Sequence, residues 1–499
     1  MTNRSNMTSS SGSLLTILRG ASLFVVGKLV YNVLEFLFNI LLTRTVGASL
    51  YGIYAYAATV LTAALTLTNG GTDKSVLKYL PQYENEPRRQ RFMLGLAFVT
   101  SLFGGIVATA ALILFAPTIS TYTLDSEIFI DTLRIFALIL LFDTIAKIIN
   151  STFRALEVVE YEILIDRFIK PALRLAAIGF ALYLSLSFIA VMASLLVASV
   201  ITLLIAIWLF LTQLNIRPNF GGSAANSDNI KAYYNYSLPL VAKDGASILR
   251  SRVDILMVGF FLSSTAVGVY NVAILIAGLL VLPLSAFNQL FPPIASRLYS
   301  NGRQSDLNEV FSTVTRWTFL ISLFLGLGAI VYRSQILALF GDEFVAGSTV
   351  LVLFVIGQLV NNAVGPSAYV LMMTEHQYIV LLNQWVFGIT NVALNYLLIL
   401  ELGLIGAAVA TVGTLAALNM TRLVEVWYLE RLFPYNFAFL KPVIAGLVAF
   451  ALMYAVEITL SSWYGMILGG LVGGVAYLGV LVALGFEASD REILDQVVS

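Results

Sequence analysis

Long apolar segments are the feature that most constrains the fold of this chain of 499 residues. Unpaired backbone N–H and C=O groups are very costly in hydrocarbon, so each run of about 20 apolar residues is expected to form a helix. Fourteen such runs follow one another, separated by short polar links. They lie near 18–43, 50–71, 92–116, 129–150, 163–185, 187–211, 237–262, 266–291, 310–332, 347–373, 378–400, 404–428, 438–460 and 463–485.

The composition agrees with a membrane setting. Hydrophobic residues make up 59% of the chain and charged residues only 11%, whereas soluble domains carry about 25% charged residues. These charges are too few to cover a soluble protein of this size. The sequence therefore predicts an all-α integral membrane protein with about 14 transmembrane helices.

Net charge and residue usage exclude several functions. The formal net charge is zero, so nothing in the overall balance suggests a nucleic acid partner. The absence of cysteine excludes disulfides, thiolate metal sites and thiol nucleophiles. His376 is the only histidine, and we expect it in a short loop near a membrane surface. We expect no metal site and no bound cofactor.

Basic residues outside the apolar runs predict the orientation. With the N-terminus in the cytoplasm, sixteen Lys and Arg residues fall on the inner side, and only Arg44 and Arg333 fall on the outer side. Inner loops of membrane proteins carry such an excess. We therefore expect a multi-pass protein of the plasma membrane with both termini in the cytoplasm.

The chain also repeats itself at a shift close to 216 residues. Gly52-Ile53-Tyr54 returns as Gly268-Val269-Tyr270, and the apolar runs recur in the same order. Because six helices per half is an even number, the repeats should be parallel, as two pseudo-symmetric six-helix bundles. The expected parts are a disordered cytoplasmic tail (1–13), an N-terminal bundle (14–211), a cytoplasmic linker (212–235), a C-terminal bundle (236–430), helices 13 and 14 (431–486) and a cytoplasmic tail (487–499).

Ionisable residues within the apolar runs are the candidate site. Each costs at least about 2.5–3.5 kcal/mol if it faces lipid at mid-membrane, so we expect most of them to face a hydrated interior or a partner. Two stripes share the same spacing and each lies on one helical face. They are Lys28, Asn32, Glu35 and Asn39 in the first helix, and Lys243, Ser247, Arg250 and Asp254 in the seventh. Such stripes suggest the facing walls of one cavity.

Cations dominate this set, and a cationic cavity suits an anion such as a pyrophosphate head group. The predicted binding residues are Lys28, Lys147, Arg167, Lys170, Arg174, Lys243, Arg250 and Arg252. The alternative is that the charges form structural pairs, such as Lys28 with Glu35, Asp143 with Lys147 and Arg250 with Asp254. Carboxylates that could take up H⁺ or bind Na⁺, or only neutralise a neighbour, are Glu35, Asp143, Asp244 and Asp254.

Amides in the second half have two interpretations. They could contact sugar hydroxyls or form hydrogen bonds between helices. They are Gln358, Asn361, Asn362, Gln384, Asn391 and Asn395.

Catalytic features are absent from the sequence. It has no phosphate-binding Gly-x-x-x-x-Gly-Lys-Ser/Thr loop and no segment long enough for a soluble catalytic domain. The carboxylates within the apolar runs have cations close by, which argues against an acid/base pair. We therefore expect a protein that is not an enzyme.

The central segment resembles a known family. The residues that carry the resemblance are Ser237-Leu238-Pro239, Asp254 before Ile255-Leu256-Met257-Val258-Gly259, Ala266-Val267-Gly268-Val269-Tyr270 and Phe291-Pro292. They are similar to the seventh and eighth helices of the polysaccharide flippases, the O-antigen flippase-like family of the multidrug/oligosaccharidyl-lipid/polysaccharide exporter superfamily. The resemblance covers nearly the whole chain.

The resemblance implies a fold and a function. It implies two six-helix bundles around a cavity, two extra C-terminal helices and alternating access. The implied cargo is an oligosaccharide on a polyprenyl (pyro)phosphate carrier, moved from the inner to the outer leaflet for cell-surface polysaccharide or glycoprotein glycan assembly. The expected partners are this lipid-linked oligosaccharide, membrane lipids and glycan assembly enzymes, and the expected state is a monomer.

Two alternatives remain open. A cation-coupled multidrug exporter of the same superfamily should have an acidic cavity, whereas this one is expected to be cationic. A membrane glycan polymerase or ligase would need a sizeable outer loop and an essential acid or base, and the sequence has neither.

Overall fold

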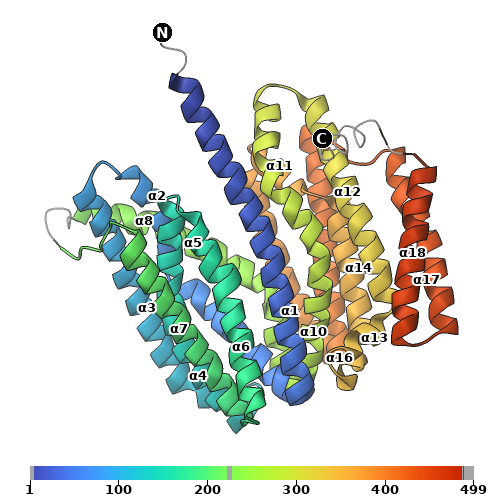
Figure 1. Cartoon of the computed structure of the whole chain (residues 1–499), viewed down its shortest axis with the longest axis horizontal. Helices are drawn as coiled ribbons and strands as arrows, with labels where there is room; N and C mark the ends of the chain where they lie inside the picture. The colour runs from blue at the N-terminus through green and yellow to red at the C-terminus, as the bar shows by residue number, and fades with distance from the viewer. Residues whose placement is uncertain (1–4, 222–226, 486, 488–499) are drawn as a thin grey trace. The chain divides into compact units, whose positions relative to one another are not determined.

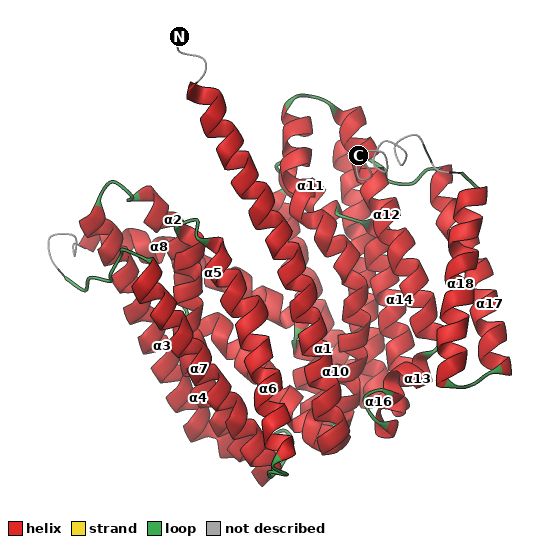
Figure 2. Cartoon of the chain, in the orientation of Figure 1, coloured by secondary structure: helices red, strands yellow, loops and turns green. Residues whose placement is uncertain are grey.

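The computed structural model describes residues 5–221, 227–485 and 487. Figure 2 shows only helices and loops over this part of the chain, which confirms the all-α prediction. The chain forms two compact units, 1–267 and 268–499, and each is described by itself.

The first unit contains nine α-helices and one π-helix, coloured blue to green in Figure 1. They are α1 (Ser5–Thr68), α2 (Thr72–Gln82), α3 (Pro87–Thr121), α4 (Glu127–Ala155), α5 (Val159–Ile163), the π-helix η1 (Leu164–Ile169), α6 (Lys170–Tyr183), α7 (Phe188–Gln213), α8 (Ser227–Ser251) and α9 (Val253–Phe261). Helix α10 (Ser264–Gly278) starts in this unit and continues into the second.

The second unit continues with long helices and three short 3₁₀ segments. They are η2 (Leu279–Val281), α11 (Leu282–Ser300), α12 (Gln304–Val331), α13 (Arg333–Ala338), η3 (Asp342–Gly347), α14 (Ser348–Val364), α15 (Ser367–Met373), α16 (Gln377–Glu430), η4 (Phe437–Phe439), α17 (Leu440–Thr459) and α18 (Trp463–Ala483).

The fourteen predicted runs all fall on helical stretches of the structure. Nine helical segments of the described residues are long and apolar enough to cross a membrane, so the protein is a multi-pass membrane protein. Two of the nine, within α1 and α16, each join two predicted runs. The three remaining predicted runs fall on helices outside these nine segments, namely on α4, on α5 to α6, and on α8 to α9. The count of fourteen membrane crossings stays a prediction.

Bends in the two longest helices occur at glycines. Gly47 in α1 has φ 76° and Gly403 in α16 has φ 58°, a region that L side chains rarely adopt. The Tyr51 hydroxyl donates to Asn39 Oδ1 at 2.7 Å and joins the two arms of the α1 bend.

These bends support the internal repeat. At a shift of 216 residues, Gly47 corresponds to Ser263, which lies in the break between α9 and α10. Gly403 corresponds to Ser187, which lies in the break between α6 and α7. The chain thus changes direction at matching places in both halves of the sequence.

Apolar packing in the first unit joins helices that carry the candidate site. Buried side chains of α2, α3, α4, α7 and α8 form one cluster, which includes Leu80, Leu94, Phe153, Phe210 and Tyr233. Helix α2 buries Val76, Tyr79 and Leu80 in this cluster. It therefore packs against the unit as well as carrying exposed basic residues.

Some predicted boundaries differ from the structure. Helix α1 begins at Ser5, within the tail that was expected to be disordered, because extending an existing helix costs less than starting one. Helix α8 begins at Ser227, within the expected linker 212–235. The seventh predicted helix belongs to the first compact unit. Residues 1–4, 222–226, 486 and 488–499 lie outside the described part of the chain.

We expect Gly71→Ala to destabilise the protein. Gly71 has φ +71°, and a Cβ there would lie 2.3 Å from the backbone oxygen of Ser237. Such strain costs about 1–3 kcal/mol even before the clash is relieved. Thermal unfolding of the detergent-solubilised protein should show a lower Tm. The control is Gly179→Ala, because nothing lies within 4 Å of a Cβ at that position. Equal Tm values for the two variants would contradict the expected close approach of α2 and α8.

Candidate functional site

A π-helix places the charged residues that lie between α5 and α6. Pro171 has no N–H, so it cannot donate to the carbonyl of Arg167 as a residue of a regular α-helix would. The chain adopts the wider π register over Leu164–Ile169 and returns to α-helix at Lys170. Such π segments are frequent at functional sites, and this one carries Asp166 and Arg167.

Lys170 is paired with a carboxylate of another helix. Its Nζ lies 2.8 Å from Asp143 Oδ2 on α4. The Ser199 hydroxyl on α7 donates to the other oxygen, Asp143 Oδ1, at 2.7 Å. The side chain of Asp143 is only 9% exposed, so both of its oxygens are satisfied within the protein. This cluster joins α4, α6 and α7.

Arg174 is held by α1 on several sides. Its guanidinium forms an ion pair with Glu35. One guanidinium nitrogen also donates to the Tyr54 hydroxyl at 2.7 Å. The guanidinium lies 4.4 Å from the ring centroid of Phe38, a cation–π distance. Arg174 thus connects both arms of the bent helix α1 to α6.

A second charged cluster joins α2, α4 and α8. Lys74 Nζ lies 2.7 Å from Asp73 Oδ2 and 3.5 Å from Asp244 Oδ2, and Lys147 Nζ lies 3.8 Å from Asp73 Oδ2. Burial opposes the ionisation of Asp73, but Lys147 and Lys74 outweigh it and hold the pKa of Asp73 below its ordinary value. Asp73 is therefore charged at neutral pH and sits between two cations.

Lys28 and Arg167 bring two positive charges together. Gly27 allows α1 to approach η1 so closely that a Cβ there would lie 3.3 Å from Arg167 Cβ. Lys28 follows Gly27, so the same close approach brings its positive charge into the neighbourhood of Arg167. The Arg167 guanidinium also lies 5.4 Å from the ring centroid of Tyr31. An anion at this point would lower the electrostatic energy.

The structure thus brings several predicted binding residues into the first unit. Lys28, Arg167, Lys170, Arg174 and Lys147 all lie in these contacts. The side chains of Lys243 and Arg250 lie outside the described part of the chain. Arg252 occupies the position before the first residue of α9 and its side chain makes no capping hydrogen bond. Asp254 is buried in the first turn of α9, where its Oδ1 accepts the N–H of Ile255 at 2.9 Å.

Two of the ion pairs that the sequence suggested as structural alternatives have different partners in the structure. Asp143 pairs with Lys170 on another helix and not with Lys147 one turn along its own helix. Glu35 pairs with Arg174 and not with Lys28. Side chains four or seven positions apart on one helix lie along a single face, whereas a facing helix can present its charge directly across the contact.

Sequence reasoning missed several residues of the site. Asp73 lies in a polar link between two apolar runs and Asp166 within the fifth run, and neither was among the predicted site residues, although Asp166 lies four residues before Lys170 and one turn of helix brings such pairs together. In the structure Asn150 Nδ2 donates to Asp166 Oδ1 at 2.7 Å. Tyr54 and Ser199 gave no sequence signal, because their roles depend on which helices pack together.

Amides of the second unit form hydrogen bonds between helices. Asn419 donates to Asn361 at 2.9 Å, and Asn362 donates to the backbone oxygen of Leu280 at 2.6 Å. Asn391 and Asn395, one turn apart on α16, each point their Nδ2 toward Thr411 Oγ1 at 3.5 Å. Some amide oxygens in the described residues are buried without a hydrogen-bond partner. They belong to Asn362, Asn391 and Asn395.

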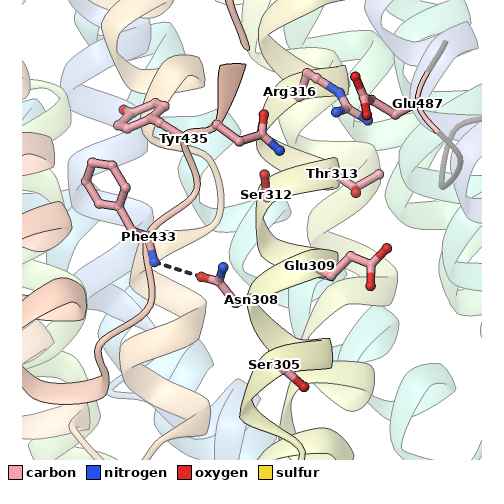
Figure 3. A pocket seen from close by; sticks show the side chains of 10 residues that line it. Ser305, Asn308, Glu309, Ser312, Thr313, Arg316, Phe433, Tyr435 and Glu487 are labelled. Carbon is pink, nitrogen blue, oxygen red and sulfur yellow. Dashed lines mark hydrogen bonds between the residues drawn. The ribbon is translucent and has the colours of Figure 1, made fainter. Parts of the chain in front are cut away.

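The second unit also contains a pocket of about 360 Å³. It lies between α12 and the loop that follows α16, as Figure 3 shows. Its lining is mostly polar, with two aromatic side chains, Phe433 and Tyr435. Sequence reasoning did not single it out.

Asp143→Asn should destabilise the first unit, because Lys170 would lose its nearest counter-charge. Breaking one side of a buried ion pair typically costs about 3–5 kcal/mol. The double variant Asp143→Asn/Lys170→Met should recover part of the loss. Thermal unfolding in detergent measures both. Asp131→Asn breaks the exposed pair with Arg134 and should change stability by less than about 1 kcal/mol. A double variant less stable than Asp143→Asn alone would contradict the pairing.

The comparisons with solved structures concern the fold. The lipid II flippase MurJ in an inward closed conformation matches with a TM-score of 0.75 at 15% identity, over 92% of this chain and 97% of that one. A multidrug resistance MATE family transporter in its inward-facing conformation matches with a TM-score of 0.66 at 14% identity, over 80% of this chain and 94% of that one. At such identities the likeness shows a shared fold.

Sequence comparisons give the family. A model described as "Polysaccharide biosynthesis protein" matches residues 17–297, and one described as MatE matches residues 246–397. The probable low-salt glycan biosynthesis flippase Agl15 of Haloferax volcanii is 28% identical over 226 residues, which is 44% of this chain and 46% of that protein. The matched part thus spans less than half of this curated relative. Because the first family model covers more than half of the 499 residues, the chain belongs to the polysaccharide biosynthesis protein family, in agreement with its resemblance to the polysaccharide flippases.

Proposed function

We propose that this protein is a flippase that moves a polyprenyl-(pyro)phosphate-linked oligosaccharide from the inner to the outer leaflet of the plasma membrane. The family match supports this proposal, and so does the relative Agl15, whose name describes a glycan biosynthesis flippase. The product would be a lipid-linked glycan ready for cell-surface polysaccharide or glycoprotein assembly. The cycle would be alternating access, with both termini in the cytoplasm.

The observation that carries the proposal is the concentration of cations where α1 packs closely against η1 and α6. Lys147, Lys170 and Arg174 lie within ion-pair distance of carboxylates, and the Arg167 guanidinium lies 5.4 Å from the ring centroid of Tyr31 on α1. A phosphate or pyrophosphate there would be attracted by these cations and would accept two parallel hydrogen bonds from the guanidinium of Arg167. We assign the carrier head group to this point.

The neighbouring ion pairs give head-group binding a way to move helices. A phosphate near Arg167 would compete with Asp143 for Lys170 and with Glu35 for Arg174, because Lys170 and Arg174 follow Arg167 at intervals of three and seven residues. Weakening these pairs loosens the contacts of α6 with α4 and α1. Head-group binding would therefore be coupled to helix packing by exchange of counter-charges.

This proposal includes no chemical step on the cargo. The protein would act as a monomer with membrane lipids around it, and glycan assembly enzymes would supply and remove the cargo. The multidrug exporter alternative has support in the MatE match over residues 246–397. The cations gathered in the first unit favour an anionic cargo over an organic cation, so we place that alternative second.

The Lys28→Gln/Arg167→Gln double variant should slow translocation at least about tenfold, because it removes both charges assigned to the head group. The assay uses proteoliposomes with a fluorescent polyprenyl-pyrophosphate oligosaccharide and follows its appearance in the opposite leaflet. Arg134→Gln is the matched control, since Arg134 is exposed and lies within ion-pair distance of Asp131, three residues before it. An unchanged translocation rate in the double variant would contradict the assignment of the head-group site to Lys28 and Arg167. No translocation by the unaltered protein, with new glycosidic bonds in the lipid-linked glycan, would indicate an enzyme instead.

We further propose that Na⁺ supplies the driving force and that the second unit binds it. Glu35, Asp143 and Asp244 are each within ion-pair distance of a cation, which makes them poor ligands for a second one. Asn391 Oδ1 and Asn395 Oδ1 are buried and, within the described residues, accept no hydrogen bond. They lie beside Thr411, and the Tyr270 hydroxyl is 3.5 Å from Thr411 Oγ1. Neutral oxygens at a bent helix suit Na⁺.

Sodium should stabilise the purified protein, and the Tm should rise with the logarithm of its concentration above the Kd. The Tm in NaCl should exceed the Tm in choline chloride at equal ionic strength, because a ligand that binds the folded state shifts unfolding. Asn395→Ala should abolish the difference, and Asn383→Ala, which removes an amide bonded to Glu425 elsewhere on α16, should keep it. An equal Tm in the two salts would leave H⁺ or the membrane potential as the driving force.

A further inference from the structure

The pocket of the second unit is built from one face of α12 and the loop after α16. Ser305, Asn308, Ser312 and Arg316 follow one another at intervals of three or four residues, so they share a helical face, and Glu309 lies next to Asn308. Figure 3 shows this polar face on one side and Phe433 and Tyr435 on the other. The volume of about 360 Å³ is in the range of small-molecule sites.

Hydrogen bonds hold the loop in place against α12. The N–H of Phe433 donates to Asn308 Oδ1 at 2.7 Å, the dashed line in Figure 3. The Ser312 hydroxyl donates to the backbone oxygen of Pro434 at 2.6 Å, and the Tyr435 hydroxyl donates to that of Ala363 at 3.1 Å. The wall of the pocket is therefore fixed before any ligand arrives, which reduces the entropy lost on binding.

Other polar groups that line the pocket keep their bonding capacity. Within the described residues, the side chains of Glu309, Thr313 and Asn436 have no hydrogen bond or ion pair. They offer carboxylate and amide acceptors, an amide donor and a hydroxyl. The ring of Phe433 is 46% exposed and meets Tyr435 edge-to-face, with ring centroids 5.1 Å apart. The pocket thus combines acceptors, donors and an apolar ring.

We propose that this pocket binds one pyranose ring of a saccharide. A sugar presents hydroxyls, which need both donors and acceptors, and a face of C–H groups, which packs on an aromatic ring. Glu309, Thr313 and Asn436 serve the hydroxyls, and Phe433 serves the C–H face. Arg316 also lines the pocket and Glu487 is paired with Lys441, but Glu309 forms no ion pair within the described residues, so a neutral or amino sugar fits better than a uronic acid.

The position of the pocket gives it a role in the proposed cycle. It lies close in sequence to Arg303 and Arg431, which the predicted orientation places on the cytoplasmic side. This role rests on the proposed flippase function: the pocket would hold a sugar of the lipid-linked glycan at the inner surface before translocation. The same chemistry would also accept the sugar of a nucleotide sugar, and the experiment separates the two.

Saturation-transfer NMR on the purified full chain tests the proposal. The probes are methyl glycosides of glucose, galactose, mannose, N-acetylglucosamine and glucuronic acid, and UDP-N-acetylglucosamine. At least one neutral or amino glycoside should show transfer to its ring protons, with weaker transfer to the glucuronide. Phe433→Ala and Glu309→Gln should each weaken that binding at least about tenfold, because they remove the apolar platform and the charged acceptor. Binding only of the nucleotide sugar would overturn the assignment to the lipid-linked glycan.

Phe437→Ala is the matched control, because Phe437 is 91% exposed in the segment after the same loop and does not line the pocket. This variant should bind the glycoside as the unaltered protein does. The absence of transfer to every neutral and amino glycoside, or equal binding by Phe433→Ala and the unaltered protein, overturns the pocket. If the protein translocates the lipid-linked glycan but binds no glycoside, the flippase function is supported and the sugar pocket is contradicted. If it binds a glycoside but does not translocate the lipid-linked glycan, the pocket is supported and the flippase function is contradicted.

Discussion

The arrangement of the first unit depends on charge compensation between helices in a region of low dielectric. An isolated ammonium or carboxylate there is very costly, and each pair must also satisfy its remaining hydrogen-bonding atoms. Lys170 meets Asp143, whose second oxygen accepts from Ser199, and Arg174 meets Glu35 and Tyr54. Because each contact joins different helices, the pairs fix which helices pack together. They also make that packing sensitive to any new charge.

The backbone cooperates with these charges at a few positions. Pro171 interrupts the regular register, and the π-helix before it carries Asp166 and Arg167 toward α1 and α4. Gly27 lets α1 approach this π-helix closely enough to bring Lys28 against Arg167. Without Pro171, Asp166 and Arg167 could follow the regular α-helical register, and a side chain at position 27 would crowd Arg167.

The sequence was sufficient for the class of fold and for the charged residues. Apolar runs of helix length, the basic residues between them and the repeat at 216 residues all report one-dimensional patterns, and these are preserved in any correct fold. The partners of the charges could not be predicted, because the Glu35–Arg174 contact joins residues 139 positions apart. Pairs along one helix are the only ones that spacing reveals. Tyr54 and Ser199 were missed for the same reason.

The pocket of the second unit could not be predicted from the sequence for a different reason. Its aromatic side chains, Phe433 and Tyr435, lie in a short loop whose path is set by hydrogen bonds to Asn308 and Ser312 on α12. The polar face of α12 is visible in the sequence, yet a polar face at a helix end usually faces solvent. Only the return of the chain after α16 turns that face into a pocket wall.

The two units therefore offer chemically different surfaces, and this division suits an amphiphilic cargo. The first unit presents ion pairs between helices, and the second presents amides, hydroxyls and aromatic rings together with a few charged side chains such as Glu309 and Arg316. A head group bound by unmatched cations would be held too tightly to leave. Where each cation already has a carboxylate nearby, an arriving phosphate must displace it. The net binding free energy is then only the difference between the cation's attraction to the phosphate and its attraction to the carboxylate. A transporter needs binding that is strong enough for admission and weak enough for release. Cations such as Lys170 and Arg174, which already lie against carboxylates, meet both requirements.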